Sequence, residues 1–553
     1  MIQLKEKTLA QLCLLASQKY GNKTAFAMFR EGEICGGRTI TYTMMSYRAR
    51  QIALLLRQLG IPEGGRVMLL SENCPEWPIS YFGITLAGAV SIPLLTGFSP
   101  EQVQNIAGHA EVSAIIISRT MEHKIKTLPP ALSSIPLIYI DNMTGDEITV
   151  STGGCEKRLP LPVPCVEKDE LPQQKPENLA TIIYTSGSMG NSKGVMLSSQ
   201  NMISCALSSL KLVKIHPHDR FLSVLPLAHA YECSISLLLP VICGSSITYL
   251  DRPPSASVLL PAVKVLRPTA MATVPLLIEK IYQNAIAPKL RKSKLYQNRF
   301  TRPLVIKAAG KKLKKAMGGK IRFFGIGGAP LSAEVENFLR IARFPYTPGY
   351  GLTEAAPLVA GAAPKKFPFR SVGAVIEAVK LRIAINEGLT GENTNFGEIQ
   401  VCGPNVMLGY YNNEQLTKEV FTDDGWLKTG DIGRVDKKGK LFICGRIKSL
   451  ILGPSGENIY PEEIEGLLSS SQFVEDVLVY SSEKGELIAL VRLSDAAKAA
   501  AHALEHVLEE LRAWANKKLA SFSRLSKIVV RNEPFEKTPT MKIKRHHQNQ
   551  CEA

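Results

Sequence analysis

A run of hydroxyl and glycine residues directly after an apolar stretch is the strongest chemical signal in the sequence. The apolar stretch, residues 180–184, has the composition of a buried strand, and the run continues through Thr-Ser-Gly-Ser-Met-Gly-Asn-Ser-Lys-Gly. Glycines let backbone N–H groups approach an anion, hydroxyls add donors, and a lysine adds a mobile positive charge. The pattern therefore predicts a polyphosphate cradle. Its candidate ligands are Thr185, Ser186, Gly187, Ser188, Gly190 and Lys193.

This run differs from a Walker A loop, which ends in Gly-Lys followed by Ser or Thr. Here Lys193 follows a serine and precedes Gly194. An ordinary flexible Gly/Ser turn is the plain alternative, and the density of donors argues against it.

Other short motifs of glycine, aromatic and charged residues follow along the chain. They are Gly-Gly-Ala-Pro-Leu at 327–331, Tyr-Gly-Leu-Thr-Glu at 350–354, Gly-Trp-Leu-Lys-Thr-Gly-Asp at 425–431, Cys-Gly-Arg-Ile-Lys-Ser at 444–449, an acidic glycine loop at 453–465 and Lys-Thr-Pro-Thr-Met-Lys-Ile-Lys at 537–544. With the first run, they resemble in type, order and spacing the motifs of the adenylate-forming superfamily. That superfamily contains acyl-CoA synthetases, luciferases and peptide-synthetase adenylation domains. The resemblance covers nearly the whole chain.

The resemblance assigns a nucleotide to the earlier motifs. It implies that residues 327–331 form one wall of an adenine slot and that the Tyr350 ring stacks on the other face, since glycine lacks a blocking Cβ. Thr353 is expected at the α-phosphate. Glu354, with Thr185, is expected to hold Mg²⁺, a hard cation that prefers oxygen ligands. The nucleotide-binding residues of these two motifs are Gly328, Ala329, Pro330, Tyr350, Gly351 and Thr353.

Asp431 resembles the ribose-binding aspartate of the family, since a carboxylate can accept hydrogen bonds from both ribose hydroxyls. A turn aspartate that bonds its own backbone is the plain alternative. Arg446 matches the arginine that also contacts the ribose where two domains meet, and Lys448 stands at the family's hinge position. The resemblance thus predicts a swivel at residues 446–449.

The C-terminal motifs imply a second half-reaction with a thiol. The loop that contains Gly456 resembles the one that closes over the arm of the thiol donor after a domain rotation. Lys542 occupies the position of the catalytic lysine, although a lysine in a basic tail is usually only solvated. Met189 and Met541 depart from the family pattern by replacing a hydroxyl and a glycine. The predicted catalytic residues are Lys542, Glu354, Thr185 and Lys193.

Residues 226–231, which read Pro-Leu-Ala-His-Ala-Tyr, correspond to the segment that lines the acid pocket in the family. The candidate substrate-binding residues are His229, Tyr231 and Gly327. A lone histidine is more often structural, so both interpretations of His229 stay open. Ala228 and Ala230 stand where many relatives carry a bulky ring, and their small size predicts space for a long substrate.

Residues 267–282 resemble the signature of long-chain fatty acyl-CoA synthetases. The implied function is ATP- and Mg²⁺-dependent activation of a long-chain fatty acid to acyl-AMP, followed by transfer to the thiol of coenzyme A. An acyl-carrier-protein synthetase with the same acyl-AMP chemistry is the close alternative. A non-catalytic acyl or nucleotide sensor is a third possibility. A sensor would be expected to lack Glu354, Asp431, Arg446 or Lys542, and all four are present.

Charge and composition restrict the partners. The 553 residues carry a formal net charge of +17, and residues 289–322 hold thirteen Lys or Arg and no Asp or Glu. This segment is either a solvated basic face or a contact for anionic lipid headgroups or an acidic carrier protein. We expect no secretory signal, no membrane span and no disulfide framework. The expected location is cytoplasmic, with peripheral membrane contact as an option; no nucleic-acid partner is expected, and the oligomeric state stays open.

The elements that position these motifs follow an α/β rhythm. The predicted fold is a large N-terminal domain of two α/β subdomains plus a small antiparallel β-barrel-like subdomain, followed by a small mobile C-terminal α/β domain. We place the adenylation domain at residues 1–446 and the C-terminal domain, with the catalytic lysine, at 447–553.

Individual elements are also predicted. Strands at 66–70 and 89–93 flank a helix at 75–86, as in a parallel βαβ unit. Residues 234–250 are expected to form a buried helix followed by a strand. The polar, proline-rich residues 145–177 are expected to be an irregular connection.

Overall fold

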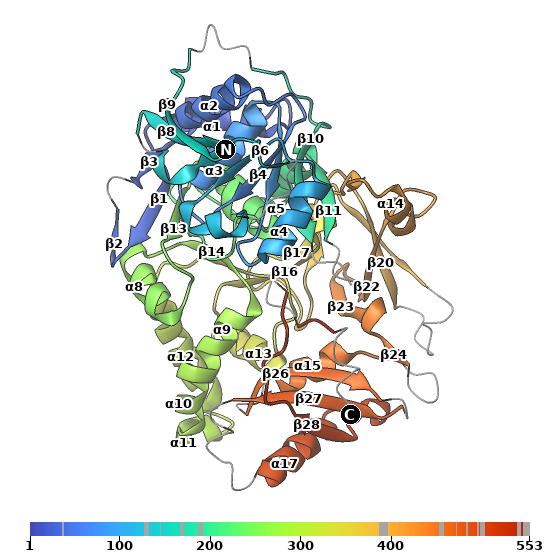
Figure 1. Ribbon diagram of the computed structural model, residues 1–553. Helices are drawn as coiled ribbons and strands as arrows, with labels where there is room; N and C mark the ends of the chain where they lie inside the picture. The colour runs from blue at the N-terminus through green and yellow to red at the C-terminus, as the bar shows by residue number, and fades with distance from the viewer. Residues whose placement is uncertain are drawn as a thin grey trace.

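The computed structural model shows a mixed α/β protein with two large sheets. It describes residues 1–35, 38–126, 132–143, 145–165, 171–185, 192–385, 396–452, 458–469, 471, 473–482, 485–494, 497, 504–538 and 543–545. Among these residues, a smaller antiparallel sheet and a C-terminal α/β unit complete the fold, and Figure 1 shows the C-terminal unit at the lower end of the molecule. The predicted fold class is confirmed. None of the helices within the described ranges combines the length and the apolar character that crossing a bilayer requires.

The first sheet carries the hydroxyl- and glycine-rich run. In spatial order its strands are β21 (Gly409–Tyr410), β11 (Lys193–Ser198), β10 (Leu179–Thr185), β5 (Val90–Pro93), β4 (Arg66–Leu70), β6 (Ala114–Ile117), β7 (Leu137–Tyr139), β8 (Glu147–Thr152) and β9 (Cys155–Pro160). The strands from β10 to β7 are parallel, and the outer ones are antiparallel. The helices α2 (Tyr42–Gln58) and α3 (Glu76–Leu86) pack together beside it, and every residue of α3 is buried. The predicted strands and helix at 66–93 are therefore confirmed.

The expectation of an irregular connection over residues 145–177 is wrong for its first half. β8 and β9 form an antiparallel hairpin at the edge of the first sheet. Gly153 and Gly154 make its turn with φ of +58° and +82°, a left-handed conformation that glycine adopts without strain. β9 exposes five of its six residues. An edge strand of this kind has the polar composition of a loop, which is why composition alone misleads.

The second sheet carries the motifs at 327–331 and 350–354. In spatial order its strands are β18 (Ala374–Val375), β17 (Leu358–Gly361), β16 (Tyr346–Gly351), β15 (Phe323–Ile326), β14 (Ala270–Thr273), β12 (Arg220–Leu222), β13 (Ser246–Leu250), β1 (Thr24–Arg30) and β2 (Glu33–Ile34), with β3 (Ile40–Thr41) also paired to β1. The strands from β1 to β16 are parallel. Both motifs thus follow the carboxyl ends of parallel strands, where ligands of open α/β sheets bind.

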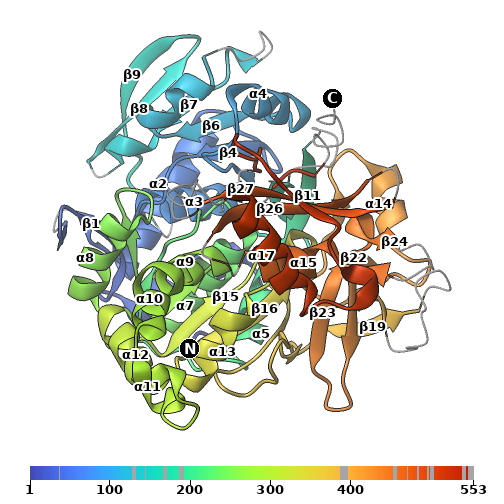
Figure 2. The ribbon, with the colours of Figure 1, turned by 90° about the horizontal axis from the view of Figure 1, so that it is seen from below.

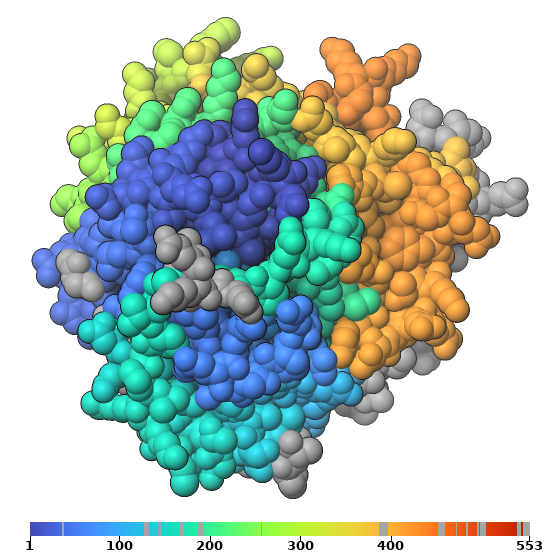
Figure 3. All heavy atoms as spheres, turned by 90° about the horizontal axis from the view of Figure 1, so that it is seen from above, coloured from blue at the N-terminus to red at the C-terminus, as the bar shows by residue number. Residues whose placement is uncertain are grey.

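A buried helical layer joins the two sheets. The helix α5 (Ser199–Ser209) contacts β10 and β11 of the first sheet and β17 of the second. Beside it run α6 (Ala230–Glu232), the π-helical η5 (Cys233–Leu238) and α7 (Leu239–Cys243), and β13 follows. Residues 234–250 are therefore a buried helix and a strand, as predicted. The helix α1 (Leu9–Tyr20) packs on α2 and α7, and Figure 3 shows the N-terminal residues, in dark blue, near the centre of the face seen from above.

The basic segment lies in a helical group beside the second sheet. The group comprises α8 (Ala256–Leu266), α9 (Pro275–Ile281), η6 (Tyr282–Ile286), α10 (Ala287–Arg291), α11 (Lys294–Gln297), α12 (Arg302–Ala316) and α13 (Ala333–Ile341). It shares a hydrophobic core with β14 and β15. In both Figure 1 and Figure 2, α11 and α12 lie at the periphery of the molecule.

The small antiparallel sheet precedes the C-terminal unit in the chain. Its strands are β19 (Lys380–Ala384), β20 (Gly397–Cys402), β22 (Leu427–Val435) and β23 (Leu441–Arg446), and the helix α14 (Glu414–Val420) lies beside it. A short η9 (Ile447–Ser449) leads to β24 (Ile451–Leu452), β25 (Asn458–Ile459), α15 (Pro461–Leu468), β26 (Val474–Ser481), β27 (Leu487–Leu493), α17 (Leu504–Asn516) and β28 (Lys527–Val530). These later elements have a hydrophobic core of their own. Gln283 of η6 donates a hydrogen bond to the Ser469 carbonyl, 2.9 Å away. This bond links the helical group beside the second sheet to the C-terminal unit.

Candidate functional site

The ends of the hydroxyl- and glycine-rich run are held side by side. Thr185, the last residue of β10, pairs with Lys193, the first residue of β11, in an antiparallel ladder. The chain therefore leaves and re-enters the first sheet at one point. The intervening candidate ligands Ser186, Gly187, Ser188 and Gly190 lie outside the described residues, as does Met189.

Tyr410 connects Lys193 with Glu354. β21 pairs with β11, so Tyr410 lies beside the run, and the Lys193 ammonium lies 5.4 Å from the centre of its ring. The Tyr410 hydroxyl donates to Glu354 Oε1 at 2.9 Å. Burial, followed by the Glu354 charge, raises the pKa of Tyr410, so the phenol stays protonated and donates. Tyr410 thus contacts both the lysine of the run and Glu354.

Tyr410 was not among the residues predicted for the site. It stands in a Gly-Tyr-Tyr-Asn stretch whose only local signal is a turn. Its importance depends on the pairing of β21 with β11, which brings together residues far apart in the chain.

A second cluster joins Tyr350, Asp431 and Arg446. Asp431 of β22 and Arg446 of β23 are register partners, and the Arg446 Nε lies 3.0 Å from Asp431 Oδ1. The Tyr350 hydroxyl donates to Asp431 Oδ2 at 2.8 Å. Asp431 is 5% exposed, whereas the Arg446 side chain is 60% exposed and can reach a ligand. Burial, and then the Asp431 charge, raises the pKa of Tyr350, so its hydroxyl remains a donor.

The two clusters are adjacent through one short segment. Tyr350 lies in β16 and Glu354 in η7 (Thr353–Ala355), directly after that strand. The Met407 amide donates to the Glu354 carbonyl at 2.9 Å and fixes the backbone there. Thr353 is half-buried, and in the chain it stands between Tyr350 and Glu354. Among the described residues, those predicted for metal and ribose are therefore linked through the segment at 350–354.

The glycines of these motifs serve the backbone in different ways. Gly328 has φ of +85°, a left-handed conformation, and together with Ala329 and Pro330 it is exposed after β15. A Cβ on Gly351 would lie 1.9 Å from the Pro357 carbonyl oxygen, so any side chain there is excluded. Gly351 thus allows the close approach of two backbone segments just before Glu354.

An apolar cavity lies behind the same strand ends. It is small, with about 40 Å³ of space open to a water-sized molecule, and its side-chain lining is almost entirely apolar. The lining residues are Ser209, Leu212, Val213, Ile215, Tyr231, Ile235, Leu239, Phe323, Gly325, Thr347, Pro348, Gly349, Leu358 and Gly361. Gly325 and Gly349 precede the motifs at 327–331 and 350–354, so the cavity lies directly beside these two motifs.

Of the predicted substrate residues, Tyr231 lines this cavity and lies against Gly327. A Cβ on Gly327 would meet the Tyr231 ring at 3.4 Å. His229 begins α6, where its Nδ1 accepts a hydrogen bond from the Tyr231 amide at 3.2 Å. This contact supports the structural interpretation of His229. Ala228 and Ala230 are buried but do not line this cavity.

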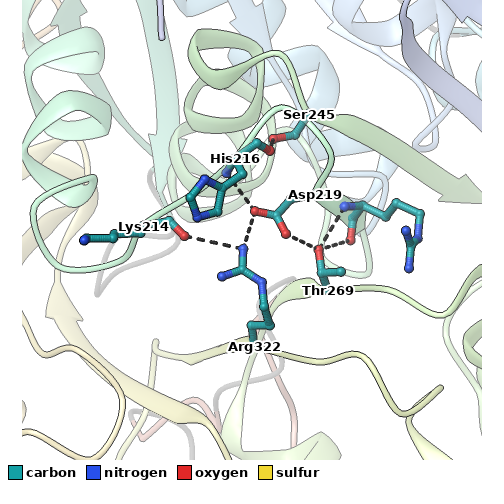
Figure 4. Close-up of polar contacts among 7 residues, drawn as sticks. Lys214, His216, Asp219, Ser245, Thr269 and Arg322 are labelled. Carbon is teal, nitrogen blue, oxygen red and sulfur yellow. Dashed lines mark hydrogen bonds and ion pairs between the residues drawn. The ribbon is translucent and has the colours of Figure 1, made fainter.

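One wall of the cavity is a loop fixed by an ion pair between the buried Asp219 and the exposed Arg322 (Figure 4). Leu212, Val213 and Ile215 line the cavity from this loop, which ends at Asp219. The buried Asp219 carboxylate accepts hydrogen bonds from Arg322, from the Thr269 hydroxyl at 2.6 Å and from the His216 amide at 2.8 Å. Burial alone would raise the pKa of Asp219, but the bonds from Arg322 and Thr269 outweigh it and lower that pKa.

Glu232 is a buried acid next to Tyr231. It is 0% exposed, and Ser223 donates to its Oε1 at 2.6 Å. Burial raises the pKa of Glu232 to about 7. This carboxyl is therefore close to half-protonated near neutral pH.

The predicted hinge and catalytic tail are described only in part. Lys448 is exposed in η9, and the neighbouring Ser449 donates to Glu462 of α15. Gly456, Met541 and Lys542 lie outside the described residues. On either side of Lys542, Lys537 pairs with Asp476 at 2.7 Å and Arg545 pairs with Glu465 at 2.7 Å. These two contacts hold the flanking chain against β26 and α15.

Comparison with known proteins identifies the class. Residues 15–411 match the family described as AMP-binding enzyme, and residues 448–550 match the AMP-binding enzyme C-terminal domain. The chain therefore belongs to the AMP-binding enzyme family.

Its relatives include acyl-CoA synthetases. It is 32% identical over 470 residues to the peroxisomal long chain acyl-CoA synthetase 6 of Arabidopsis thaliana, covering 78% of this chain and 65% of the relative. It is 28% identical to fatty acyl-CoA synthetase A of Dictyostelium discoideum, covering 92% of this chain and 83% of the relative. The chain thus spans less than two thirds of the Arabidopsis protein.

Solved structures share the fold. The o-succinylbenzoate CoA synthetase of Bacillus subtilis, in complex with its acyl-adenylate intermediate, superposes with a TM-score of 0.75 at 22% identity, covering 98% of both chains. The anthranilate CoA ligase AuaEII, in complex with anthranoyl-AMP, gives a TM-score of 0.77 at 20% identity, covering 98% of this chain and 96% of that chain.

Proposed function

We propose that this protein activates a long-chain fatty acid with ATP and transfers the acyl group to coenzyme A. The observation that supports this most directly is the joint position of two polar clusters and an apolar cavity. Tyr350, Asp431 and Arg446 suit a nucleoside, and Lys193 and Glu354 suit a phosphate chain with its cation. The apolar lining of the cavity suits an aliphatic chain. A CoA ligase needs these three subsites side by side.

In the first half-reaction, a carboxylate oxygen of the acid attacks the α-phosphorus of ATP. A new P–O bond forms, the bond to the β-phosphate oxygen breaks, and pyrophosphate leaves. Lys193 and the donors of the run at 185–190 are proposed to stabilise the charge on the phosphates, together with Lys542. Catalysis in this step is mainly positioning, because no covalent enzyme intermediate is needed.

The metal assignment fits the chemistry of the side chains. Glu354 contributes a carboxylate and Thr185 a hydroxyl, and both are hard oxygen ligands of the kind that Mg²⁺ prefers. When bound, the cation supplies neutralisation of the phosphate charge. The hydrogen bond from Tyr410 orients the Glu354 carboxylate in advance.

In the second half-reaction, a thiol attacks the acyl carbonyl of acyl-AMP. The C–S bond forms, the C–O bond to AMP breaks, and the thiol proton passes to solvent or to AMP. The C-terminal unit is proposed to swivel at residues 446–449, which exchanges Lys542 for the loop at Gly456. Hinge motion of a small domain about a short linker is a known type of transition.

The proposal of a long aliphatic acid rests on the cavity lining. Thr347 and Ser209 are the lining residues with polar side chains apart from the Tyr231 hydroxyl, so a charged or strongly polar acid would lose hydration without compensation. The printed names of the sequence relatives, acyl-CoA synthetases, agree with this choice.

The test is ATP/pyrophosphate exchange over a graded series of saturated fatty acids, with o-succinylbenzoate and other aromatic acids as comparators. We expect exchange to rise with chain length and to be weak with aromatic acids. Leu212→Ala, which enlarges the cavity, should move the optimum to longer acids, while Leu260→Ala at an exposed position on α8 should not. Equal exchange with all acids, or none with any, would contradict the proposal.

The acceptor is tested separately. Supplied acyl-AMP should be converted to acyl-CoA by the enzyme at a rate that depends little on salt, because coenzyme A does not need to dock through a charged protein surface. An acyl-carrier-protein synthetase would instead prefer the acidic carrier protein and lose activity steeply with ionic strength. A clear preference for the carrier protein would replace coenzyme A in this proposal.

A further inference from the structure

The helical hairpin of α11, the turn at residues 298–301 and α12 combines exposed cations with exposed apolar side chains. Within residues 289–322 all thirteen Lys and Arg side chains belong to exposed residues. Arg291 pairs with Glu334 and Arg322 with Asp219. In the described part of the chain, no ion pair engages the lysines of α12, which are Lys307, Lys311, Lys312, Lys314 and Lys315.

The apolar residues of the hairpin are unusually exposed for their size. Phe300 is 87% exposed, Leu304 64% and Leu295 61%. Scattered exposed apolar residues are ordinary, but here three large ones fall within ten residues of one projecting turn. Figures 1 and 2 place this hairpin at the periphery, away from the central sheets.

The turn that presents Phe300 is braced rather than loose. The Phe300 amide donates to the Asn298 side chain at 2.9 Å, and Arg302 Nε donates to the Tyr296 carbonyl at 2.9 Å. The Arg302 guanidinium also lies 5.3 Å from the centre of the Tyr296 ring. The fold therefore holds the Phe300 ring outward while its own polar groups are satisfied.

We propose that the α11–α12 hairpin docks on the surface of an anionic lipid bilayer. Lysines attract anionic headgroups, and exposed Phe and Leu side chains enter the boundary between headgroups and acyl chains. A convex tip with projecting apolar residues fits a bilayer, which deforms around it, better than a protein surface, which would need a matching groove. The absence of any acid over 289–322 removes the repulsion that would oppose such docking.

The hairpin is connected to the wall of the acyl cavity. α12 leads to Arg322, whose guanidinium donates to Asp219 and to the Lys214 carbonyl at 3.5 Å (Figure 4). The next residue, Phe323, lines the cavity, and so do Leu212 and Ile215 of the loop that Arg322 fixes. Docking would thus hold this wall of the cavity close to a bilayer, and long-chain acids partition into bilayers. This last step rests on the proposed function, whereas docking itself does not.

The test is co-sedimentation of the full chain with vesicles of phosphatidylcholine alone and with vesicles in which a third of the lipid is phosphatidylglycerol. We expect strong binding only to the anionic vesicles, with a steep loss as salt is raised. Each lysine that reaches the surface raises partitioning about five-fold. Replacing Lys311, Lys312, Lys314 and Lys315 by Gln should therefore lower it on the order of a hundred-fold or more.

A matched variant controls for net charge. Lys380, Lys418, Lys437 and Lys438 are exposed on the small antiparallel sheet and its neighbouring helix, and their replacement by Gln removes the same charge elsewhere. This control should bind anionic vesicles like the parent. A loss equal to that of the α12 variant would overturn the proposal, since total charge alone would then explain binding.

A second variant tests insertion. Phe300→Ser with Leu304→Ser keeps every cation, and we expect it to lower vesicle binding about ten-fold while leaving pyrophosphate exchange in detergent-free solution unchanged. Binding to anionic vesicles that survives both the α12 and the Phe300 variants would refute docking through this hairpin. So would a result in which the α12 variant keeps vesicle binding but loses affinity for an acidic carrier protein.

Discussion

The polar clusters around Tyr350 and Glu354 and the α11–α12 hairpin differ in how their charged groups are held. Asp431 and Glu354 are each held by a tyrosine hydroxyl, and Asp431 also by Arg446, so these groups are fixed before a ligand arrives. The lysines of α12 are exposed and engage in no ion pair within the described ranges. Fixed groups suit a ligand of one geometry, whereas free cations suit a fluid surface of anions. A single substitution should therefore be severe at the first region and mild at the second.

The largest effect is expected for Glu354→Gln. The change keeps the shape but removes the charge proposed to hold Mg²⁺, and we expect pyrophosphate exchange to fall at least about 100-fold. Glu414→Gln, at an exposed position in α14, is the control and should leave the rate unchanged. A Glu354→Gln rate within a few-fold of the parent would break the comparison, because the fixed group would not matter.

The second effect concerns the buried Glu232, whose folded-state pKa is raised to about 7. The folded protein binds the proton of the Glu232 carboxyl more tightly than the unfolded chain does, so protonation stabilises the fold. This stabilisation is complete below the unfolded pKa of about 4.3. It is lost as pH rises to about 7, with a total change on the order of 4 kcal/mol. Glu232→Gln should flatten this part of the profile of unfolding free energy against pH. An unchanged slope in chemical denaturation would contradict the assignment.

A smaller effect is expected for Tyr350→Phe. It removes the hydroxyl that donates to Asp431, a hydrogen bond to a charged group, and we expect the KM for ATP to rise about ten-fold. Tyr346→Phe on the same strand removes a longer bond to Glu336, at 3.3 Å, and serves as the matched control. If both variants bind ATP alike, the Tyr350 contact does not position the Asp431 carboxylate that is proposed to bind the ribose.

The smallest effect is expected for a single lysine of the hairpin. Lys312→Gln should lower partitioning to anionic vesicles about five-fold or less and leave pyrophosphate exchange unchanged. A much larger loss from this one residue would show that α12 has a specific binding pocket instead of a diffuse surface. Vesicle flotation at two salt concentrations distinguishes these results.

Much of the fold could be predicted because its signals are local. The strand at Arg66–Leu70 and the helix that follows are apolar runs of the right length, and β4 begins and ends at the predicted residues. Asp431 and Glu354 stand in dense motifs, and the structure brings them near each other through Tyr350. Their roles in binding and catalysis stay predictions, as do the domain boundary and the hinge.

The rest could not be predicted because it depends on contacts between distant residues. Tyr410 reaches Glu354 only because β21 pairs with β11. Asp219 and Arg322 are 103 positions apart, and nothing in either local sequence indicates that they meet. The edge strand β9 could not be predicted, because it exposes five of its six residues and so carries no apolar pattern.

The hydrogen bond from Gln283 to the Ser469 carbonyl has a mechanical consequence. Gln283 lies in η6, a few residues before the basic helices, and Ser469 ends α15 of the C-terminal unit. Any swing of that unit which carries Ser469 away must break this latch, at a cost of about 1 kcal/mol. For the proposed swivel, a bond of this strength favours the orientation described here by about five-fold without preventing the movement.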